Sequence, residues 1–420
     1  MKPSIKFDRT LVTVLVDEVV HVMLELTAPD ATQVERAPLD VVIVLDRSGS
    51  MSGAPLESVT AATAHLLRLA GTDDRVAVVA FDGEVQLVLP LAHHEPDSAS
   101  RAVRAIQAGG STNLSGGWLK GLEMLTSAPR ADALRRIIVL TDGHANEGIT
   151  GADQLVPLIK SGYGRGVTTS CIGFGDGHDE RLLAALADGG MGNDYWCAGP
   201  DQAAQVFADE FGGLASVVAQ NVSVEITPSA AVAAMAVLNE FPITPLADDA
   251  VQVALGDAYG GERRKLVAKF HLRPVTTPGP IDVATLTIRW AATTGDVALH
   301  TVTVPVVVTA GSGADPGADA EVTEELVRLV VAKNRREARD AAERGNYRSA
   351  SLLLSTSATL LNPAMAMPGE IDELRRNAAE LDEGVWSPAA SKRQFSRSRS
   401  THKGRRTDYE AAVDPDQPPV

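Results

Sequence analysis

Between residues 38 and 218, short apolar runs take turns with amphipathic stretches. The runs at 41–45 and 137–140 have no polar alternation, which predicts strands buried on both faces of a parallel sheet. The same patterns predict further strands at 75–81, 85–89, 167–174 and 195–198, and helices near 54–70, 96–107, 114–126, 152–162, 178–188 and 200–218. The Asp82-Gly83 pair predicts a hairpin. We therefore expect a doubly wound α/β sheet, mostly parallel, with one antiparallel edge strand and helices on both faces.

The segments on either side of this unit have the period of half-buried strands. Residues 5–28 and 220–310 alternate apolar and polar positions, with turn residues between the runs. That pattern is typical of an antiparallel β-sandwich. We expect residues 5–37 and 219–310 to form one sandwich domain, so that the α/β domain at 38–218 is an insertion in it.

The C-terminal quarter predicts helices followed by a polar tail. Residues 311–320 are rich in Gly, Ala, Pro and Asp and predict a linker. Apolar residues then recur at helical spacing through 321–383, which predicts a helical hairpin or small bundle. Residues 384–420 are expected to be a disordered tail. Its stretch 391–407 carries seven Lys or Arg and no Asp or Glu, so weak nucleic-acid binding by this stretch stays an alternative to a merely solvated segment.

Polar side chains follow both buried runs of the predicted sheet. Asp46, Ser48 and Ser50 come at every second position after the first run, and alternate side chains of an extended chain point the same way. Asp142 ends the second run, and Thr112 lies in a glycine-rich loop. The carboxyl ends of parallel strands meet at one edge of the sheet. Hydroxyl and carboxylate oxygens there suit a hard cation such as Mg²⁺, although Asp-x-Ser-x-Ser by itself is also an ordinary capped turn.

The order and spacing of these residues resemble the von Willebrand factor A family, over roughly residues 38–218. That family carries a metal-ion-dependent adhesion site (MIDAS) of the form Asp-x-Ser-x-Ser, then Thr, then Asp. The resemblance implies a VWA, Rossmann-like fold and a divalent cation, Mg²⁺ before Mn²⁺ or Ca²⁺. It also implies that an Asp or Glu of a partner protein completes the coordination of the cation. The metal ligands implied here are Asp46, Ser48, Ser50, Thr112 and Asp142.

Composition limits the binding partners and the cellular location that we expect for the protein. A formal net charge of −16 argues against broad binding of nucleic acid or anionic membranes by the folded part. The two cysteines, Cys171 and Cys197, lie in apolar segments, where buried free thiols are expected before a disulfide. The first residues lack the apolar core of a signal peptide, and no apolar run reaches the roughly 18 residues of a membrane span. We expect a cytoplasmic protein with no membrane span.

Three functions fit these residues. The first is a non-enzymatic, metal-dependent protein-binding module. The second is a Mg²⁺-dependent phosphohydrolase, which also uses an Asp at a strand end. Such enzymes usually place a general-acid Asp two residues later, where this chain has Ser48, and no P-loop motif occurs. The third is an adaptor or scaffold subunit of a larger assembly, for example one linked to an ATPase, with the helices at 321–382 as its docking element.

Overall fold

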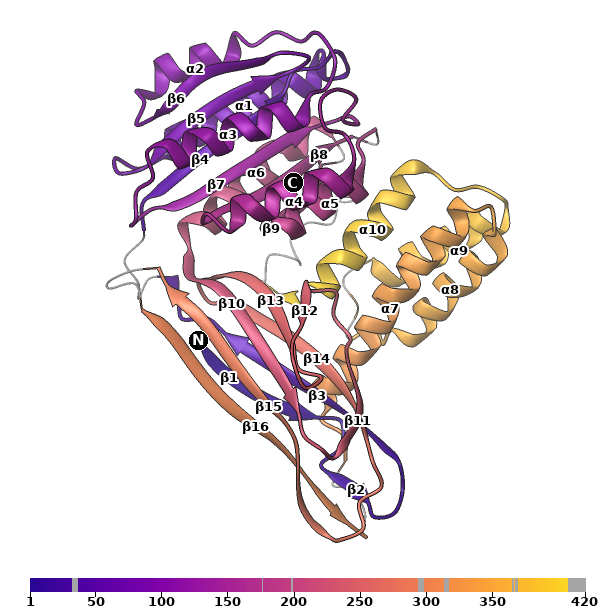
Figure 1. Cartoon of the computed structure of the whole chain (residues 1–420). Coiled ribbons are helices and arrows are strands. Elements are labelled where there is room, and N and C mark those ends of the chain that lie inside the picture. The colour runs from indigo at the N-terminus through magenta and orange to yellow at the C-terminus, as the bar shows by residue number, and fades with distance from the viewer. Residues whose placement is uncertain are drawn as a thin grey trace. The chain divides into compact units, whose positions relative to one another are not determined.

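The computed structural model of the chain divides into two compact units (Figure 1). It describes residues 1–31, 37–175, 177–197, 199–293, 298–312, 317–364, 366 and 369–406. One unit comprises 31–220 with 292–297, and the other comprises 1–30, 221–291 and 298–420. The first unit is the α/β fold that the apolar runs predict, and the second holds most of the remaining strands and the C-terminal helices.

The α/β unit is built on a six-stranded sheet of order β6-β5-β4-β7-β8-β9. Its strands are β4 (Leu39–Asp46), β5 (Arg75–Phe81), β6 (Val85–Ala92), β7 (Leu134–Thr141), β8 (Val167–Phe174) and β9 (Met191–Cys197). All neighbours pair in parallel except β5 and β6, which form the antiparallel hairpin expected around Asp82-Gly83. The chain proceeds outward from β4 in one direction and from β7 in the other, so the order reverses between these two strands.

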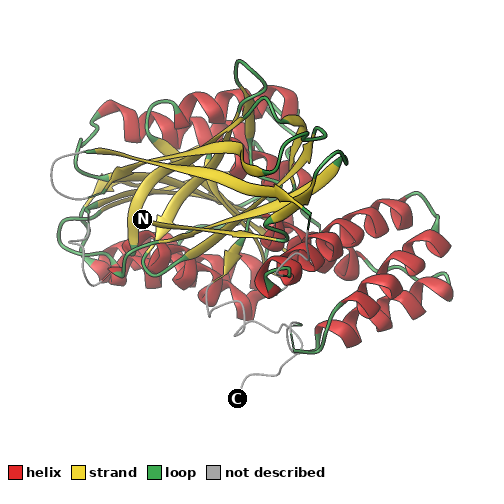
Figure 2. Ribbon diagram, turned by 90° about the horizontal axis from the view of Figure 1, so that it is seen from below, coloured by secondary structure: helices red, strands yellow, loops and turns green. Residues whose placement is uncertain are grey.

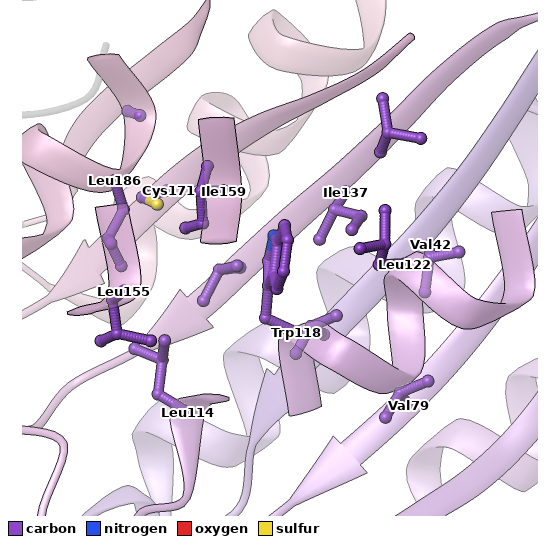
Figure 3. Close-up of a cluster of buried hydrophobic side chains, with 14 of the residues drawn as sticks. Val42, Val79, Leu114, Trp118, Leu122, Ile137, Leu155, Ile159, Cys171 and Leu186 are labelled. Carbon is purple, nitrogen blue, oxygen red and sulfur yellow. The ribbon is translucent and has the colours of Figure 1, made fainter. Parts of the chain in front are cut away.

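Six helices accompany this sheet in the described part of the unit. They are α1 (Ala54–Leu69), α2 (Pro96–Arg104), α3 (Leu114–Ser127), α4 (Ala152–Tyr163), α5 (Glu180–Gly189) and α6 (Pro200–Ala215). All eight residues of β4 are buried, which explains its continuous apolar run. Trp118 of α3 is 1% exposed and packs against sheet residues such as Val42 and Ile137 (Figure 3). The predicted α/β fold, including its antiparallel edge strand, is confirmed.

The second unit contains two sheets. The first has the order β1-β3-β14-β11, with β17 also on β14, and the second has the order β12-β13-β10-β15-β16-β2. The strands before the α/β unit are β1 (Lys2–Phe7), β2 (Leu11–Thr13) and β3 (Glu18–Thr27). Those after it are β10 (Val217–Pro228), β11 (Val232–Val237), β12 (Ile243–Pro245), β13 (Val251–Tyr259), β14 (Arg263–Leu272), β15 (Gly279–Ala292), β16 (Leu299–Gly311) and β17 (Arg405–Arg406).

Strands from both sides of the α/β unit pair with each other. β3 and β14 are antiparallel from Glu18↔Leu272 to Thr27↔Arg263, and β2 pairs in parallel with the end of β16. Residues that precede the α/β unit therefore lie in the same sheets as residues that follow it.

Helices complete the second unit, and Figure 2 shows them in red beside its yellow strands. They are α7 (Ala320–Glu343), α8 (Tyr347–Leu360), α9 (Glu370–Asp382) and α10 (Pro388–His402). α7, α8 and α9 share an apolar core, and Val322 and Leu329 of α7 pack against Met23 and Val267 of the sheet. The prediction of helices from about 321 to 383 agrees with α7–α9.

The disorder expected from residue 384 is not what the structure shows at 388–406. α10 is helical, and β17 pairs with the start of β14. Buried contacts account for the order: Gln394 is 0% exposed, and Arg397 forms a 2.7 Å ion pair with Glu373 of α9. Glu373 lies on another helix, so the composition of the segment by itself suggested a solvated tail. Residues 407–420 lie outside the described residues.

Candidate metal centre

The predicted ligands come from three loops at one edge of the α/β sheet. Asp46 is the last residue of β4, and Ser48 and Ser50 follow it into the short 3-10 turn Gly49–Met51. Asp142 directly follows β7, the parallel neighbour of β4. Thr112 lies two residues before α3. The strand order reverses between β4 and β7, which is where open α/β sheets form their ligand sites.

Hydroxyl and carboxylate groups from these loops are in direct contact. The Ser50 hydroxyl donates to Asp142 Oδ1 at 2.7 Å, and the Ser48 and Ser50 Oγ atoms are 3.2 Å apart. A Cβ added at Gly143 would lie 3.7 Å from Ser50 Oγ and 3.8 Å from Thr112 Oγ1, so these two hydroxyls face the same point. The structure thus brings Ser48, Ser50, Thr112 and Asp142 together.

Asp46 lies beneath this group and is fully buried. Its Oδ2 accepts a 2.5 Å hydrogen bond from the Thr141 hydroxyl, and its Oδ1 accepts one of 2.8 Å from the Ser48 N–H. Burial raises the pKa of the Asp46 carboxyl and the charge of Asp142 adds to this, while the bonds from Thr141 and Ser48 act in the opposite direction. Burial also raises the pKa of Asp142, against the hydrogen bond from Ser50. Two partly desolvated carboxyls close together favour a bound cation.

The donor set suits a hard divalent cation. It consists of three hydroxyls and two carboxyls, with oxygen as the only donor element, as Mg²⁺ prefers. Among the described residues, the hydrogen-bond donors to Asp46 are a hydroxyl and an amide rather than a Lys or Arg. No group of three or more His, Cys, Asp or Glu in the described ranges is placed to hold a metal, so a metal here would depend on the hydroxyls. The residues therefore fit the cation.

Two residues at the site were missed by sequence reasoning. The Thr141 hydroxyl donates to the buried Oδ2 of Asp46. The only feature of the local sequence that could have indicated this role is that Thr141 directly precedes Asp142. Asn146 contacts Thr112 twice: its Oδ1 accepts from the Thr112 N–H at 2.8 Å, and its own N–H donates to the Thr112 carbonyl at 3.1 Å. Nothing in the local pattern at residue 146 distinguishes this Asn from an ordinary loop residue.

Other polar residues of these loops have local partners. Asn113 caps α3 by accepting from the Gly116 N–H at 2.9 Å. The Ser111 hydroxyl donates to Glu147. His144 is 68% exposed, and its Nδ1 lies 3.8 Å from Asp179 Oδ2. These residues therefore have structural roles in the loops around the site.

The family comparison bears on the same segment. Residues 40–207 match the family model of the von Willebrand factor type A domain. These residues form a VWA domain. The matched range begins in β4 and ends in α6, so it contains all five predicted ligands.

Relatives of the chain match different shares of its length. An uncharacterized protein of Synechocystis is 26% identical over 333 residues, which cover 77% of this chain and 78% of that protein. The E3 ubiquitin-protein ligase WAV3 of Arabidopsis thaliana is 27% identical over 58% of this chain and 32% of its own. Inter-alpha-trypsin inhibitor heavy chain H3 of Bos taurus is 30% identical over a segment that covers 36% of this chain and 18% of that protein. The chain thus matches less than a third of the length of the last two proteins.

Two solved structures share the fold over nearly the whole chain. A von Willebrand factor type A protein from Catenulispora acidiphila matches with a TM-score of 0.76 and 16% identity, over 96% of this chain and 97% of that one. The ArnB paralog VWA2 from Sulfolobus acidocaldarius has the same coverage, a TM-score of 0.61 and 16% identity. In the described ranges, no helix of this chain combines the length and the apolar character that crossing a membrane requires.

Proposed function

We propose that the chain is a non-enzymatic, divalent-cation-dependent protein-binding module whose MIDAS is formed by Asp46, Ser48, Ser50, Thr112 and Asp142. VWA domains mediate protein–protein interactions and commonly bind a divalent cation, which supports the general assignment. The observation that supports the proposal for this chain is the gathering of the Ser48, Ser50 and Thr112 hydroxyls beside Asp142, which the Ser50 hydroxyl contacts at 2.7 Å.

The residues have different parts in this proposal. Ser48, Ser50 and Thr112 offer neutral oxygens, while Asp46 and Asp142 offer the negative charge that balances the cation. A bound Mg²⁺ would supply an electrophilic position for an Asp or Glu side chain of the partner protein. Because three of the five donor groups are neutral hydroxyls, which are weaker donors than carboxylates, the cation would remain electrophilic toward an added carboxylate. Mn²⁺ and Ca²⁺ also accept oxygen ligands and are alternatives.

A cytoplasmic setting is part of the proposal. Cys171 and Cys197 are both buried, and a reducing compartment keeps such thiols reduced. Burial raises the pKa of the Cys197 thiol to about 11, which leaves it unreactive near neutral pH. Measuring the distribution of the tagged protein between cell fractions tests this point, and recovery in a secreted fraction would contradict it.

A phosphohydrolase is less well supported than a binding module. A general acid would be needed two residues after Asp46, and that position holds Ser48, whose hydroxyl lies 3.2 Å from the Ser50 hydroxyl. Hydrolysis of a generic phosphate ester that disappears in Asp46→Asn would reverse the ranking of the two functions.

An adaptor role is a second candidate, favoured by exposed apolar side chains on α8. Leu352 is 68% exposed and Leu360 is 43% exposed. Deleting the C-terminal helices would not test this role cleanly, because Val322 and Leu329 of α7 pack on the sheet. Leu352→Asp instead changes the surface while leaving that packing in place. Loss of a large assembly on size-exclusion chromatography, with unchanged metal binding, is the expected result, and unchanged assembly would contradict the adaptor role.

A metal titration followed by thermal unfolding tests the binding proposal. We expect the melting temperature of the native chain to rise with Mg²⁺ or Mn²⁺, because a ligand that binds only the folded state stabilises it by about 2.7 kcal/mol at 100 times Kd. Asp46→Ala and Thr112→Ala should remove the response. Partners should then be captured with metal and lost with EDTA. A native protein that responds to none of Mg²⁺, Mn²⁺ or Ca²⁺ would contradict the proposal.

A further inference from the structure

The loop that carries Asp142 turns back onto the loop that carries Thr112. Asn146 lies four residues after Asp142, and it contacts the backbone of Thr112 on both sides. Its side-chain Oδ1 accepts from the Thr112 N–H at 2.8 Å, and its backbone N–H donates to the Thr112 carbonyl at 3.1 Å. The Glu147 N–H approaches the same carbonyl at 3.3 Å. Both backbone polar groups of Thr112 are therefore held by one segment.

Further contacts join the same two loops. The Ile149 N–H donates to the Ser115 hydroxyl at 2.9 Å, and the Ser111 hydroxyl donates to Glu147. Gly148 has a φ of +71°, and a Cβ at this position would collide with the side chains of Asn113 and Ser115. Residues 146–149 thus lie against residues 111–115 along their length, with no room for a larger residue at 148. The loops behave as one unit that presents Thr112 and Asp142 together.

We infer that Asn146 is a positioning residue, which sets the Thr112 hydroxyl at the metal centre and links it to Asp142. This inference rests on the proposed function. The Thr112 side chain is 3% exposed, and its hydroxyl faces the same point as that of Ser50. A hydroxyl is a weak, neutral ligand, so its contribution to metal affinity depends on how well its position is fixed before the metal arrives. Asn146 supplies that constraint without itself being a ligand.

The side-chain amide is the part of Asn146 that a substitution can remove. Asn146→Ala deletes the acceptor for the Thr112 N–H but keeps the backbone bond to the Thr112 carbonyl. Asn146→Asp keeps an acceptor oxygen at the same place but adds a negative charge. His144→Asp combined with Asn146→Ala adds a charge nearby without restoring the acceptor, so it separates the effect of charge from the effect of position.

The experiment is a calorimetric titration of Mg²⁺, and of Mn²⁺, into the full-length chain and these three variants. Metal-free thermal unfolding of each protein is measured alongside. We expect Asn146→Ala to weaken metal binding by about tenfold to a hundredfold, as does the loss of groups that orient metal ligands. Its metal-free melting temperature should stay close to the native value. Asn146→Asp should bind at least as tightly as the native chain, and the double variant should remain weak.

The outcomes separate this inference from the proposed function. Native affinity in Asn146→Ala would overturn the role of Asn146 while leaving the metal site intact. Full recovery in the double variant would show that charge, rather than the acceptor, sets the affinity, and would overturn it too. A native chain that binds neither Mg²⁺ nor Mn²⁺ would instead overturn the metal site itself.

Discussion

Ser50 donates a 2.7 Å hydrogen bond to Asp142, joining the loops after β4 and β7 across 92 residues of sequence. We predict that Ser50→Ala weakens Mg²⁺ binding by at least about tenfold, because it removes both a ligand oxygen and the group that orients Asp142. The Mg²⁺ dependence of the melting temperature measures this effect. Ser52→Ala is the matched control, since it removes an exposed hydroxyl from the same loop. Equal Mg²⁺ responses in the two variants would contradict the role of Ser50.

Asp40 anchors the opposite end of β4. Its side chain is 1% exposed, and Arg75 and Arg130 each donate to it at 2.5 Å. Burial raises the pKa of Asp40, but the two guanidiniums outweigh that effect and hold the pKa below its ordinary value of 3.8. Asp40→Asn should destabilise the fold by about 2 kcal/mol at pH 7, less than a fully buried pair because both guanidiniums remain partly exposed.

The effect of Asp40 depends on pH in a defined direction. Because the pKa is lower in the folded state, the carboxylate stabilises the protein above pH 3.8, and this contribution is lost as pH falls through the folded pKa. Urea unfolding between pH 7 and pH 2 gives the difference in the free energy of unfolding between the native chain and Asp40→Asn. That difference should shrink at the acid end, and a constant difference would show that the charge of Asp40 is not the cause.

Glu210 joins α6 to three strands of the VWA sheet. It is fully buried, accepts hydrogen bonds from Ser170 and Tyr195 at 2.5 Å and 2.8 Å, and lies 3.3 Å from Arg136. Burial raises the pKa of Glu210, but the charge of Arg136 and the hydrogen bonds outweigh it and lower the pKa. Glu210→Ala should cost about 3–5 kcal/mol, because it removes the buried carboxylate that balances the charge of Arg136.

Urea unfolding measures the cost at Glu210, and the double variant Arg136→Met/Glu210→Leu is its control. Replacing both charges by apolar groups avoids a lone buried charge, so the double variant should recover much of the loss. If Glu210→Ala unfolds at the same urea concentration as the native protein, the contacts of Glu210 do not contribute to the stability of the domain.

Most strands of the VWA domain could be predicted from continuous apolar runs in the sequence. Parallel strands buried on both faces leave continuous apolar sequence, so β4 and β7 were predicted together with the acidic residues that end them. For β8 the predicted and observed bounds, 167–174, coincide. Residue types and positions predicted an oxygen-rich site, and the resemblance to the von Willebrand factor A family supplied the full set of five candidate ligands. The structure brings four of them together, with Asp46 beneath.

Long-range polar contacts could not be predicted in the same way. Asn146 has its role because a loop returns to Thr112, and Thr141 has its role because β4 and β7 are neighbours. The segment 388–406 is ordered by partners such as Glu373 and Asn239, which no local pattern links to it. The Asn239 side chain, for example, donates to the His402 carbonyl at 3.1 Å across 163 residues.

His402, at the end of α10, makes the stability of the second unit dependent on pH. Its side chain is 4% exposed. Burial, followed by the charges of Arg336 and Arg399, lowers its pKa to about 4, although Glu240 Oε1 lies 3.5 Å from its Nε2. Burial and two cations outweigh that single carboxylate, so the folded state holds a neutral imidazole.

Acid should therefore destabilise the packing of the C-terminal segment that contains His402. The unfolded chain takes up a proton near pH 6.5 and the folded one near pH 4, so stability falls by up to about 3 kcal/mol as pH drops between these values. Urea unfolding from pH 7.5 to pH 4 measures the slope, and His402→Gln should flatten it. His271→Gln, which removes an exposed imidazole from β14, controls for the loss of a histidine. An equal slope in His402→Gln and the native chain would show that another group is responsible.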